Sequence, residues 1–316
     1  MILTVTLNAA LDVTYEVGAL EQGGSHRVRT VRERAGGKGV NVARVATALE
    51  CEVVATGLLG GAVGDLVRDD LDQSGIAHDF ADIAGTSRRT LTIVETETGE
   101  ATVLNEAGPD VRPEEWQAFL DHFGTLAASA AVVVLSGSLP PGLPTDAYAE
   151  LVRRAPGRVV LDTDGTALTE GVPGRPDVIK PNADELRRVT AGTVSNGGNP
   201  AGASEVVSRA ASLRAAGAGS VLVSLGADGM LAVTSDGVWR AVPPRVVVGN
   251  PTGAGDAAVA ATARALLLER PWDELLRDAV ALSAAAVAAP VAGDFDPDLY
   301  VRLLPEIKIE GLPCPS

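Results

Sequence analysis

The sequence has few aromatic residues and far fewer basic than acidic residues. Aromatic side chains make up 3% of the 316 residues, so the hydrophobic core must be built mainly from Ala, Val and Leu. The formal net charge is −15, from 26 Lys and Arg against 41 Asp and Glu. We therefore expect no nucleic-acid partner and no anionic membrane surface, and an anionic ligand needs cations gathered locally.

Cysteine and histidine are also scarce. The two cysteines, Cys51 and Cys314, are far apart and have no metal-binding spacing, and the three histidines form no cluster. These absences argue against a Cys/His metal site. The apolar start of the chain has no cationic segment before it, so we expect no signal peptide and a reducing, cytoplasmic setting.

Long hydrophobic runs are missing as well. No run reaches the ~18 apolar residues of a membrane span. The most apolar stretches, near 257–268 and 279–292, are rich in alanine. We expect both to be helices packed in the protein core rather than membrane segments.

The stretch Asn250-Pro-Thr-Gly-Ala-Gly-Asp256 is the strongest local signal. It follows the apolar run 245–249, which predicts a strand, and precedes the Ala/Leu run 257–268, which predicts a helix. Glycines at a strand-to-helix turn let the backbone approach a ligand. The free N–H groups of a helix's first turn attract anions. This turn is therefore a candidate anion site.

Asp256 at this turn has three interpretations. The first is a helix cap. The second is a general base that takes a proton from a hydroxyl while the backbone amides hold the phosphoryl group under attack. The third is part of a dinucleotide site, since Gly253-x-Gly255-x-x-Ala258 fits a loose fingerprint that normally lies in the first βα turn of its fold. The local sequence leaves these interpretations open.

Buried strands and helices alternate along most of the chain, which predicts an α/β fold. We expect one domain over residues 1–316, with a parallel-rich central sheet and helices on both faces. In such sheets ligands bind at the carboxyl ends of the strands. Polar segments follow the predicted strands at 136–142, 162–165, 180–185, 224–229 and 250–256. A polar loop is expected at 192–200, before a helix over about 204–216 with Ser204 as its N-cap.

Two β-rich insertions interrupt this alternation, at about 12–34 and 86–106. The first holds short strands at 13–17 and 26–32, and the second holds a hairpin with arms at 88–95 and 101–105 that turns at Thr98-Gly99. We expect the two insertions to form one small β-sheet that covers the site as a lid. Because its edges could pair between subunits, a homodimer through the lid is also expected.

A second glycine segment, Ala35-Gly-Gly-Lys-Gly39, opens a predicted helix over 40–49. Its spacing is not that of a P-loop, but it suits close approach to a polar ligand. Asn41 on the first turn offers a donor and an acceptor to sugar hydroxyls. Asp12 follows the first predicted strand, where it is either a ligand group or an ordinary turn residue.

Taken together, the motifs resemble those of the ribokinase-like (pfkB) carbohydrate kinases. Those that carry the resemblance occur in the family's order over nearly the whole chain: Ala35-Gly-Gly-Lys-Gly-Val-Asn41, Ser136-Gly-Ser-Leu-Pro-Pro-Gly142, Lys180-Pro-Asn-Ala-Asp-Glu185, Val223-Ser-Leu-Gly226 and Thr252-Gly-Ala-Gly-Asp256. The start Met1–Asn8, the position of Asp12 and Asn105-Glu-Ala-Gly-Pro109 are most similar to the tagatose-6-phosphate kinase and 1-phosphofructokinase branch.

The resemblance implies ATP-dependent transfer of a phosphoryl group to a hydroxyl of a phosphorylated ketohexose, with ATP and Mg²⁺ as cofactors. It makes Asp256 the general base and the backbone of Gly253, Ala254 and Gly255 the anion hole. The residues that it places at the sugar are Asp12, Arg27, Gly37, Lys38, Asn41, Arg88 and Ser138. Those that it places at the nucleotide are Asn182, Ser224, Gly226, Gly229 and Thr252, with Glu185 at Mg²⁺ through water.

Other functions stay open at this point. The first alternative is a kinase of the same fold that acts on an unphosphorylated sugar, cyclitol or nucleoside. The second is a non-catalytic sugar or nucleotide sensor, and the third is a dehydrogenase. Arg27, Lys38 and Arg88 discriminate between the kinase hypotheses. If they converge near Asp12, the acceptor carries a phosphate, and if they scatter, a neutral acceptor gains support.

Overall fold

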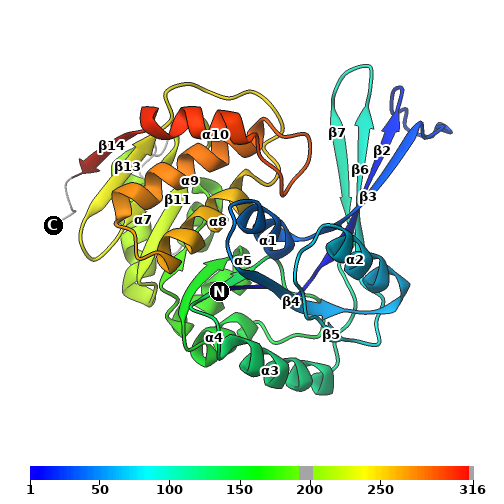
Figure 1. The fold of residues 1–316 in the computed structure, drawn as a ribbon, viewed down its shortest axis with the longest axis horizontal. Coiled ribbons are helices and arrows are strands. Elements are labelled where there is room, and N and C mark those ends of the chain that lie inside the picture. Colours follow the sequence, from blue (N-terminus) through cyan, green and yellow to red (C-terminus); the bar gives the residue numbers. More distant parts are fainter. Residues whose placement is uncertain (192–201, 313–316) are drawn as a thin grey trace.

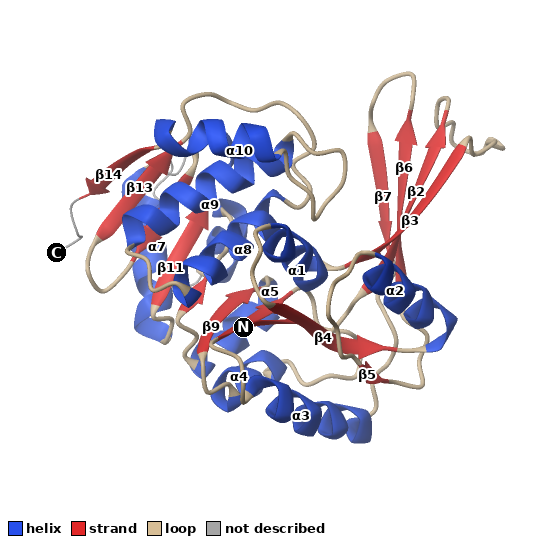
Figure 2. Cartoon of the chain, in the orientation of Figure 1, coloured by secondary structure: helices blue, strands red, loops and turns tan. Residues whose placement is uncertain are grey.

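A large sheet with helices around it and a smaller sheet projecting from one side make up the structure, a computed structural model (Figures 1 and 2). It describes residues 1–191 and 202–312, so the loop expected at 192–200 lies outside the described residues. None of the helices within those ranges has the length and apolarity needed to cross a membrane.

The large sheet has ten strands in the order β14-β13-β12-β11-β10-β9-β8-β1-β4-β5. Neighbours from β11 to β5 pair in parallel, and the neighbours from β11 to β14 pair antiparallel. The strands are β1 Ile2–Thr6, β4 Val53–Leu59, β5 Ala81–Asp82, β8 Val132–Ser136, β9 Arg158–Asp162, β10 Val178–Ile179, β11 Ser220–Ser224, β12 Met230–Val233, β13 Val238–Val242 and β14 Lys308–Leu312. The parallel-rich α/β sheet expected from the sequence is confirmed.

Helices cover both faces of this sheet because successive strand residues point to opposite sides. Ile2 belongs to the hydrophobic cluster under one helix layer, and Leu3 belongs to the cluster under the other. The first layer contains α1 Lys38–Ala48, α2 Gly61–Gln73, α8 Ala254–Leu267, α9 Trp272–Val287 and α10 Pro297–Leu303. The second contains α3 Pro113–Ala127, α4 Ala147–Arg154, α5 Gly165–Gly171, α6 Ala183–Val189 and α7 Ala203–Ala216.

The small sheet forms from the two insertions, in the order β3-β2-β6-β7. Its strands are β2 Ala10–Val17, β3 Thr30–Gly36, β6 Arg88–Glu95 and β7 Ala101–Asn105. The register places Asp12 opposite Arg34 on β3 and Thr90 on β6. Side chains alternate between faces, so these three polar residues share one face while Val13 and Leu91 lie on the other.

Three local predictions were wrong. The run 245–249 is an irregular loop with Val248 91% exposed, because β13 already pairs with β12 and β14 and offers no free edge. The strand expected at 26–32 lies at Thr30–Gly36 instead, which leaves residues 26–29 in the preceding loop. Ser204 lies inside α7, whose N-cap is Gly202.

Gly39 and Gly124 provide a matched test of how α1 packs on the sheet. A Cβ atom on Gly39 would lie 2.8 Å from the Val5 carbonyl oxygen of β1, whereas one on Gly124 in α3 would meet nothing within 4 Å. We expect Gly39→Ala to lower the free energy of unfolding by about 1–3 kcal/mol through overpacking. Gly124→Ala should raise it by up to about 1 kcal/mol, because alanine is the better helix former. Urea denaturation measures both, and equal effects would contradict this packing.

Candidate active site

The turn before α8 has the geometry of an anion site. Gly253 is the N-cap of α8, and its φ of 86° lies in the left-handed region that favours glycine. A Cβ atom there would also lie 2.9 Å from Cα of Ala292, so the turn packs closely against that residue. The Ala254 N–H donates to the Pro251 carbonyl oxygen over 3.2 Å, and the first N–H that donates back to the N-cap is that of Ala257, over 2.9 Å to Gly253. The N–H groups between them carry the positive end of the helix dipole.

Asp256 lies on the first turn of this helix with its side chain buried. The Asn41 amide of α1 donates a hydrogen bond from Nδ2 to Asp256 Oδ2 over 2.8 Å. Burial raises the pKa of Asp256 to about 7, and the negative charge of Asp162 acts in the same direction. The bond from Asn41 and the charge of Lys38 oppose the rise. Asp256 is therefore a carboxylate whose ionisation falls near neutral pH.

Two lysines share one buried carboxylate beside this turn. Asp162, at the end of β9, lies 3.4 Å from Lys38 Nζ and 3.2 Å from Lys180 Nζ. Burial opposes the ionisation of Asp162, but Lys180 and Lys38 hold its pKa below the usual value. The negative charge of Asp162 raises the pKa of Lys38, and burial lowers it. The charge has the larger effect, so the pKa of Lys38 is raised. A Cβ atom on Gly255 would lie 3.4 Å from Lys180 Nζ, so this ammonium group lies beside the anion-binding turn.

Lys180 and Asp162 were not among the residues predicted for the site. Lys180 occurs in the motif Lys180–Glu185, and Asp162 ends a predicted strand. Both lie in the polar segments 162–165 and 180–185 expected at strand carboxyl ends, but neither was given a role in the site. What the sequence could not show is that their side chains meet.

A pocket of about 550 Å³ lies between the small sheet and the carboxyl ends of the large sheet. Five of the predicted site residues line it, and they come from α1, β6, α6 and the loop after β8: Gly37, Lys38, Arg88, Ser138 and Glu185. Three acidic side chains, Glu106, Asp164 and Glu185, share its wall with two cations. The pocket thus has mixed charge in a strongly acidic protein.

Asp12 and Arg88 lie at the small-sheet end of this site. Burial raises the pKa of Asp12, and the hydrogen bond from Thr90 and the charge of Arg88 partly offset that rise. Arg88 donates from Nε to the Asn8 carbonyl oxygen over 3.0 Å, and burial lowers its pKa. The Asn8 side chain in turn donates to Ser138 Oγ over 3.1 Å. One polar network therefore joins β6 to the loop after β8.

Arg27 does not join this group within one chain. It is exposed, in the loop between β2 and β3. Because Glu16 pairs with Thr30 and Ala10 pairs with Gly36, this loop lies at the end of the small sheet farthest from the pocket (Figure 1). The expected convergence of Arg27 with Lys38 and Arg88 is therefore not seen.

The predicted nucleotide residues surround the ends of β10 and β11. Asn182 and Glu185 form a capping box on α6, in which Asn182 Oδ1 accepts from Glu185 N over 2.8 Å and Glu185 Oε2 accepts from Asn182 N over 2.8 Å. The backbone of Asn182 forms an isolated parallel β-bridge with Ser224 at the end of β11. Gly226 and Gly229 lie in the turn that follows. Thr252 is exposed in the loop before α8, where its N–H donates to Asn250.

A divalent metal fits this site only if one or two carboxylates hold it together with substrate phosphates and water. Among the described residues no three Asp, Glu, His or Cys side chains gather as a metal cluster. Mg²⁺ in phosphoryl-transfer sites is commonly held by one or two carboxylates together with substrate phosphates and water. Glu185 and Asp164 on the pocket wall fit that arrangement.

The comparisons with known proteins agree with this geometry. The pattern that defines the pfkB family carbohydrate kinases matches residues 5–298. The chain belongs to this family. Phosphofructokinase-2 from Escherichia coli, solved in complex with potassium, is 26% identical over 96% of this chain and 98% of that one, with a TM-score of 0.89.

Two Thermotoga maritima proteins extend the comparison. One, described as a 1-phosphofructokinase candidate, is 26% identical over 99% of this kinase and 100% of that chain, with a TM-score of 0.85. A ribokinase is 19% identical over 97% of this kinase and 99% of that chain, with a TM-score of 0.76, and so shows the shared fold alone. The protein is a ribokinase-like sugar kinase, which confirms the expected enzyme class and argues against the dehydrogenase and sensor alternatives.

The buried position of Asp256 predicts how stability depends on pH. Its folded pKa of about 7 lies above its usual value of 3.8, so the carboxylate costs folding free energy once it is charged. This cost is absent below pH 3.8, where the carboxyl group is protonated in both the folded and the unfolded state, grows as pH rises from 3.8, and is complete above about pH 7. Asp256→Asn should therefore gain stability relative to wild type over this range. Denaturant unfolding against pH measures it.

Asp69→Asn, at an exposed position on α2, controls for the loss of one negative charge. If Asp256→Asn and wild type keep a constant stability difference from pH 4 to pH 8, the burial argument for Asp256 is wrong.

Proposed function

We propose that this kinase transfers the γ-phosphoryl group of ATP to a hydroxyl of a phosphorylated ketohexose, such as tagatose 6-phosphate or a fructose phosphate. The observation that carries the proposal is the buried Asp256 carboxylate beside the N-terminus of α8, flanked by Lys38 and Lys180. Such a group can accept a hydroxyl proton next to a site that binds phosphoryl oxygens.

Asp256 acts as the general base in this proposal. A base is most effective when its pKa lies near the working pH, and burial brings the pKa of Asp256 to about 7. Asn41 holds one carboxylate oxygen by its 2.8 Å hydrogen bond and leaves the other for the acceptor hydroxyl. Activity should accordingly rise with pH through the neutral range.

Negative charge that develops on the transferred group is stabilised from two sides. The backbone N–H groups of Gly253, Ala254 and Gly255 lie on one side, and Lys38 and Lys180 supply positive charge on the other. Mg²⁺, when bound through Glu185 and water, would neutralise part of the charge on ATP. Asn182, Ser224, Gly226, Gly229 and Thr252 are proposed to hold the nucleotide.

The phosphorylated acceptor is supported by both the pocket and the neighbours. Asp12 and Ser138 are proposed to hold sugar hydroxyls, with the backbone of Gly37 beside them, while Lys38 and Arg88 supply cations. Phosphofructokinase-2 from Escherichia coli has also been solved with fructose 6-phosphate, and that chain is 25% identical with a TM-score of 0.86. The position of Arg27 favours the second candidate, an unphosphorylated sugar, cyclitol or nucleoside, unless another subunit supplies this residue.

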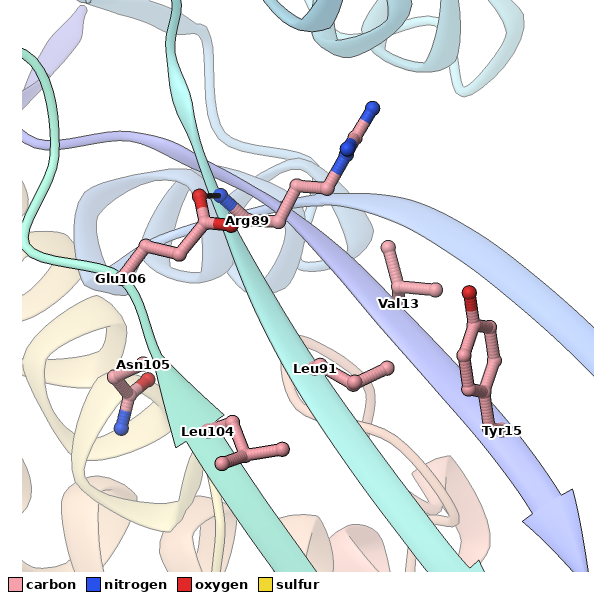
Figure 3. A pocket seen from close by; sticks show the side chains of 7 residues that line it. All are labelled: Val13, Tyr15, Arg89, Leu91, Leu104, Asn105 and Glu106. Atoms are coloured by element: carbon pink, nitrogen blue, oxygen red, sulfur yellow. Dashed lines mark hydrogen bonds between the residues drawn. The ribbon is translucent and has the colours of Figure 1, made fainter. Parts of the chain in front are cut away.

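We further propose that residues 1–316 form one domain, with the small sheet inserted as a lid that excludes water during transfer. The face of the lid turned away from Asp12 carries Val13, Leu91 and Leu104 together with Tyr15, around a shallow pocket of about 320 Å³ (Figure 3). Pairing this apolar face with a second copy would form a homodimer. The cytoplasmic location stays a prediction.

The decisive experiment measures ADP release and sugar phosphate formation over a panel of acceptors with ATP and Mg²⁺. The panel contains tagatose 6-phosphate, fructose 6-phosphate, fructose 1-phosphate and their unphosphorylated parents. We expect turnover with a phosphosugar, and a loss of about 10²–10⁴-fold in kcat for Asp256→Asn, because a general base contributes about that much.

The outcomes separate the candidates. Turnover with neutral sugars alone would replace the phosphosugar assignment by the second candidate. Full activity of Asp256→Asn would remove the general base from the proposal. Asp69→Asn should match wild type on every acceptor, because it lies on the exposed side of α2.

The dimer has its own test in a pair of neighbouring residues. Leu104 and Val103 of β7 are 52% and 51% exposed and point to opposite faces of the small sheet. We expect wild type to sediment at twice the monomer mass at micromolar concentration. Leu104→Asp should shift it to the monomer, because a charge enters the apolar face, while Val103→Asp should stay dimeric. A monomeric wild type would rule the proposed interface out.

A further inference from the structure

A single arginine of the small sheet contacts the loop that follows α9. Arg34 on β3 donates from its two terminal nitrogens to the two carboxylate oxygens of Asp294, over 2.6 Å and 3.1 Å. The same guanidinium donates to the Ala292 carbonyl oxygen over 3.2 Å. Bidentate pairs of this kind define a geometry as well as an attraction. The small sheet is thereby tied to the segment 292–294.

That segment packs against two parts of the proposed phosphoryl-transfer site. A Cβ atom on Gly253 would lie 2.9 Å from Cα of Ala292 and 3.2 Å from the Gly293 nitrogen. A Cβ atom on Gly293 would lie 3.1 Å from Oδ1 of Asn41, the residue whose amide holds Asp256. No side chain fits between these backbones, so a displacement of segment 292–294 reaches both the anion-binding turn and Asn41.

The other end of the connection lies at the acceptor site. The register places Arg34 opposite Asp12 on the same face of the small sheet. The next residue of β3, Ala35, is anchored separately, because its N–H donates to Asp70 of α2 over 3.0 Å and the buried Arg44 of α1 pairs with that same carboxylate. Arg34 therefore lies on the sheet face that carries Asp12, on a strand that α1 and α2 hold at the next residue.

We propose that Arg34 and Asp294 are positioning residues for phosphoryl transfer. Their ion pair holds segment 292–294 against Gly253 and Asn41, and so aligns the anion-binding turn and Asp256 with the small sheet. This proposal rests on the function proposed above. The pair is 26% and 45% exposed, and exposed pairs add little to global stability. Its loss should therefore alter the alignment of the site rather than the unfolding of the chain.

Asp294→Ala is the most informative variant, because it breaks the pair and leaves the charge of Arg34 near Asp12 unchanged. We expect kcat for sugar phosphorylation to fall on the order of 3- to 30-fold, with KM for ATP and the midpoint of unfolding little changed. The ratio of ADP released to sugar phosphate formed should rise, because a misaligned site lets water compete for the phosphoryl group. Arg34→Gln combined with Asp294→Ala should lose no more than the larger single effect.

Arg32→Gln is the matched control. Arg32 lies two residues earlier on the same face of β3, and its 2.6 Å ion pair with Glu16 stays within the small sheet. This variant should keep the kcat and the product ratio of wild type. An equal loss in Arg32→Gln, or unchanged kcat and product ratio in Asp294→Ala, would overturn the proposal.

Amide hydrogen exchange supplies a readout that needs no acceptor. The amides of Ala254 and Ala257, which donate to the carbonyl oxygens of Pro251 and Gly253, should exchange faster in Asp294→Ala than in wild type, and at the wild-type rate in Arg32→Gln. If wild type phosphorylates no sugar on the panel, the proposed function fails while the exchange rates still decide whether the pair positions the turn. Unchanged exchange in Asp294→Ala would refute that role.

Discussion

The buried charges around Asp162 are the constraint on which the rest of the site depends. A carboxylate that is 1% exposed needs compensation, and Lys38 and Lys180 supply it from α1 and from the end of β10. The two ammonium groups offset the carboxylate that they share and also act on Asp256, which places their positive charge beside the N-terminus of α8. These local cations allow a protein with a net charge of −15 to receive an anion there.

Asp256 owes its chemistry to the same arrangement. Burial and the charge of Asp162 raise its pKa, while Asn41 and the lysines limit the rise. The balance near pH 7 therefore requires that the carboxyl ends of β9 and β10 and the N-termini of α1 and α8 meet at one place, which is what the parallel sheet provides.

Much of the fold followed from local sequence, and the errors have physical causes. The hairpin arms 88–95 and 101–105 were predicted at the bounds that β6 and β7 have, because alternation and the Thr98-Gly99 turn are local signals. The run 245–249 has strand propensity, but the free side of the preceding strand β13 is paired with β14, a strand that was not predicted. The contacts of Lys180 with Asp162 and of Arg34 with Asp294 join segments far apart in sequence, so no local pattern indicates them.

The two sheets divide the work of the proposed reaction. The groups placed at phosphoryl transfer lie on the large sheet and its helices, where Asp256 and Lys180 are buried and Lys38 is held by its ion pair with Asp162. Asp12 and Arg88, placed at the acceptor, lie on the small sheet, whose outer face and edges are exposed. Changes in the small sheet can therefore alter which sugar is accepted without disturbing the transfer groups, provided that the connection at segment 292–294 still aligns the two.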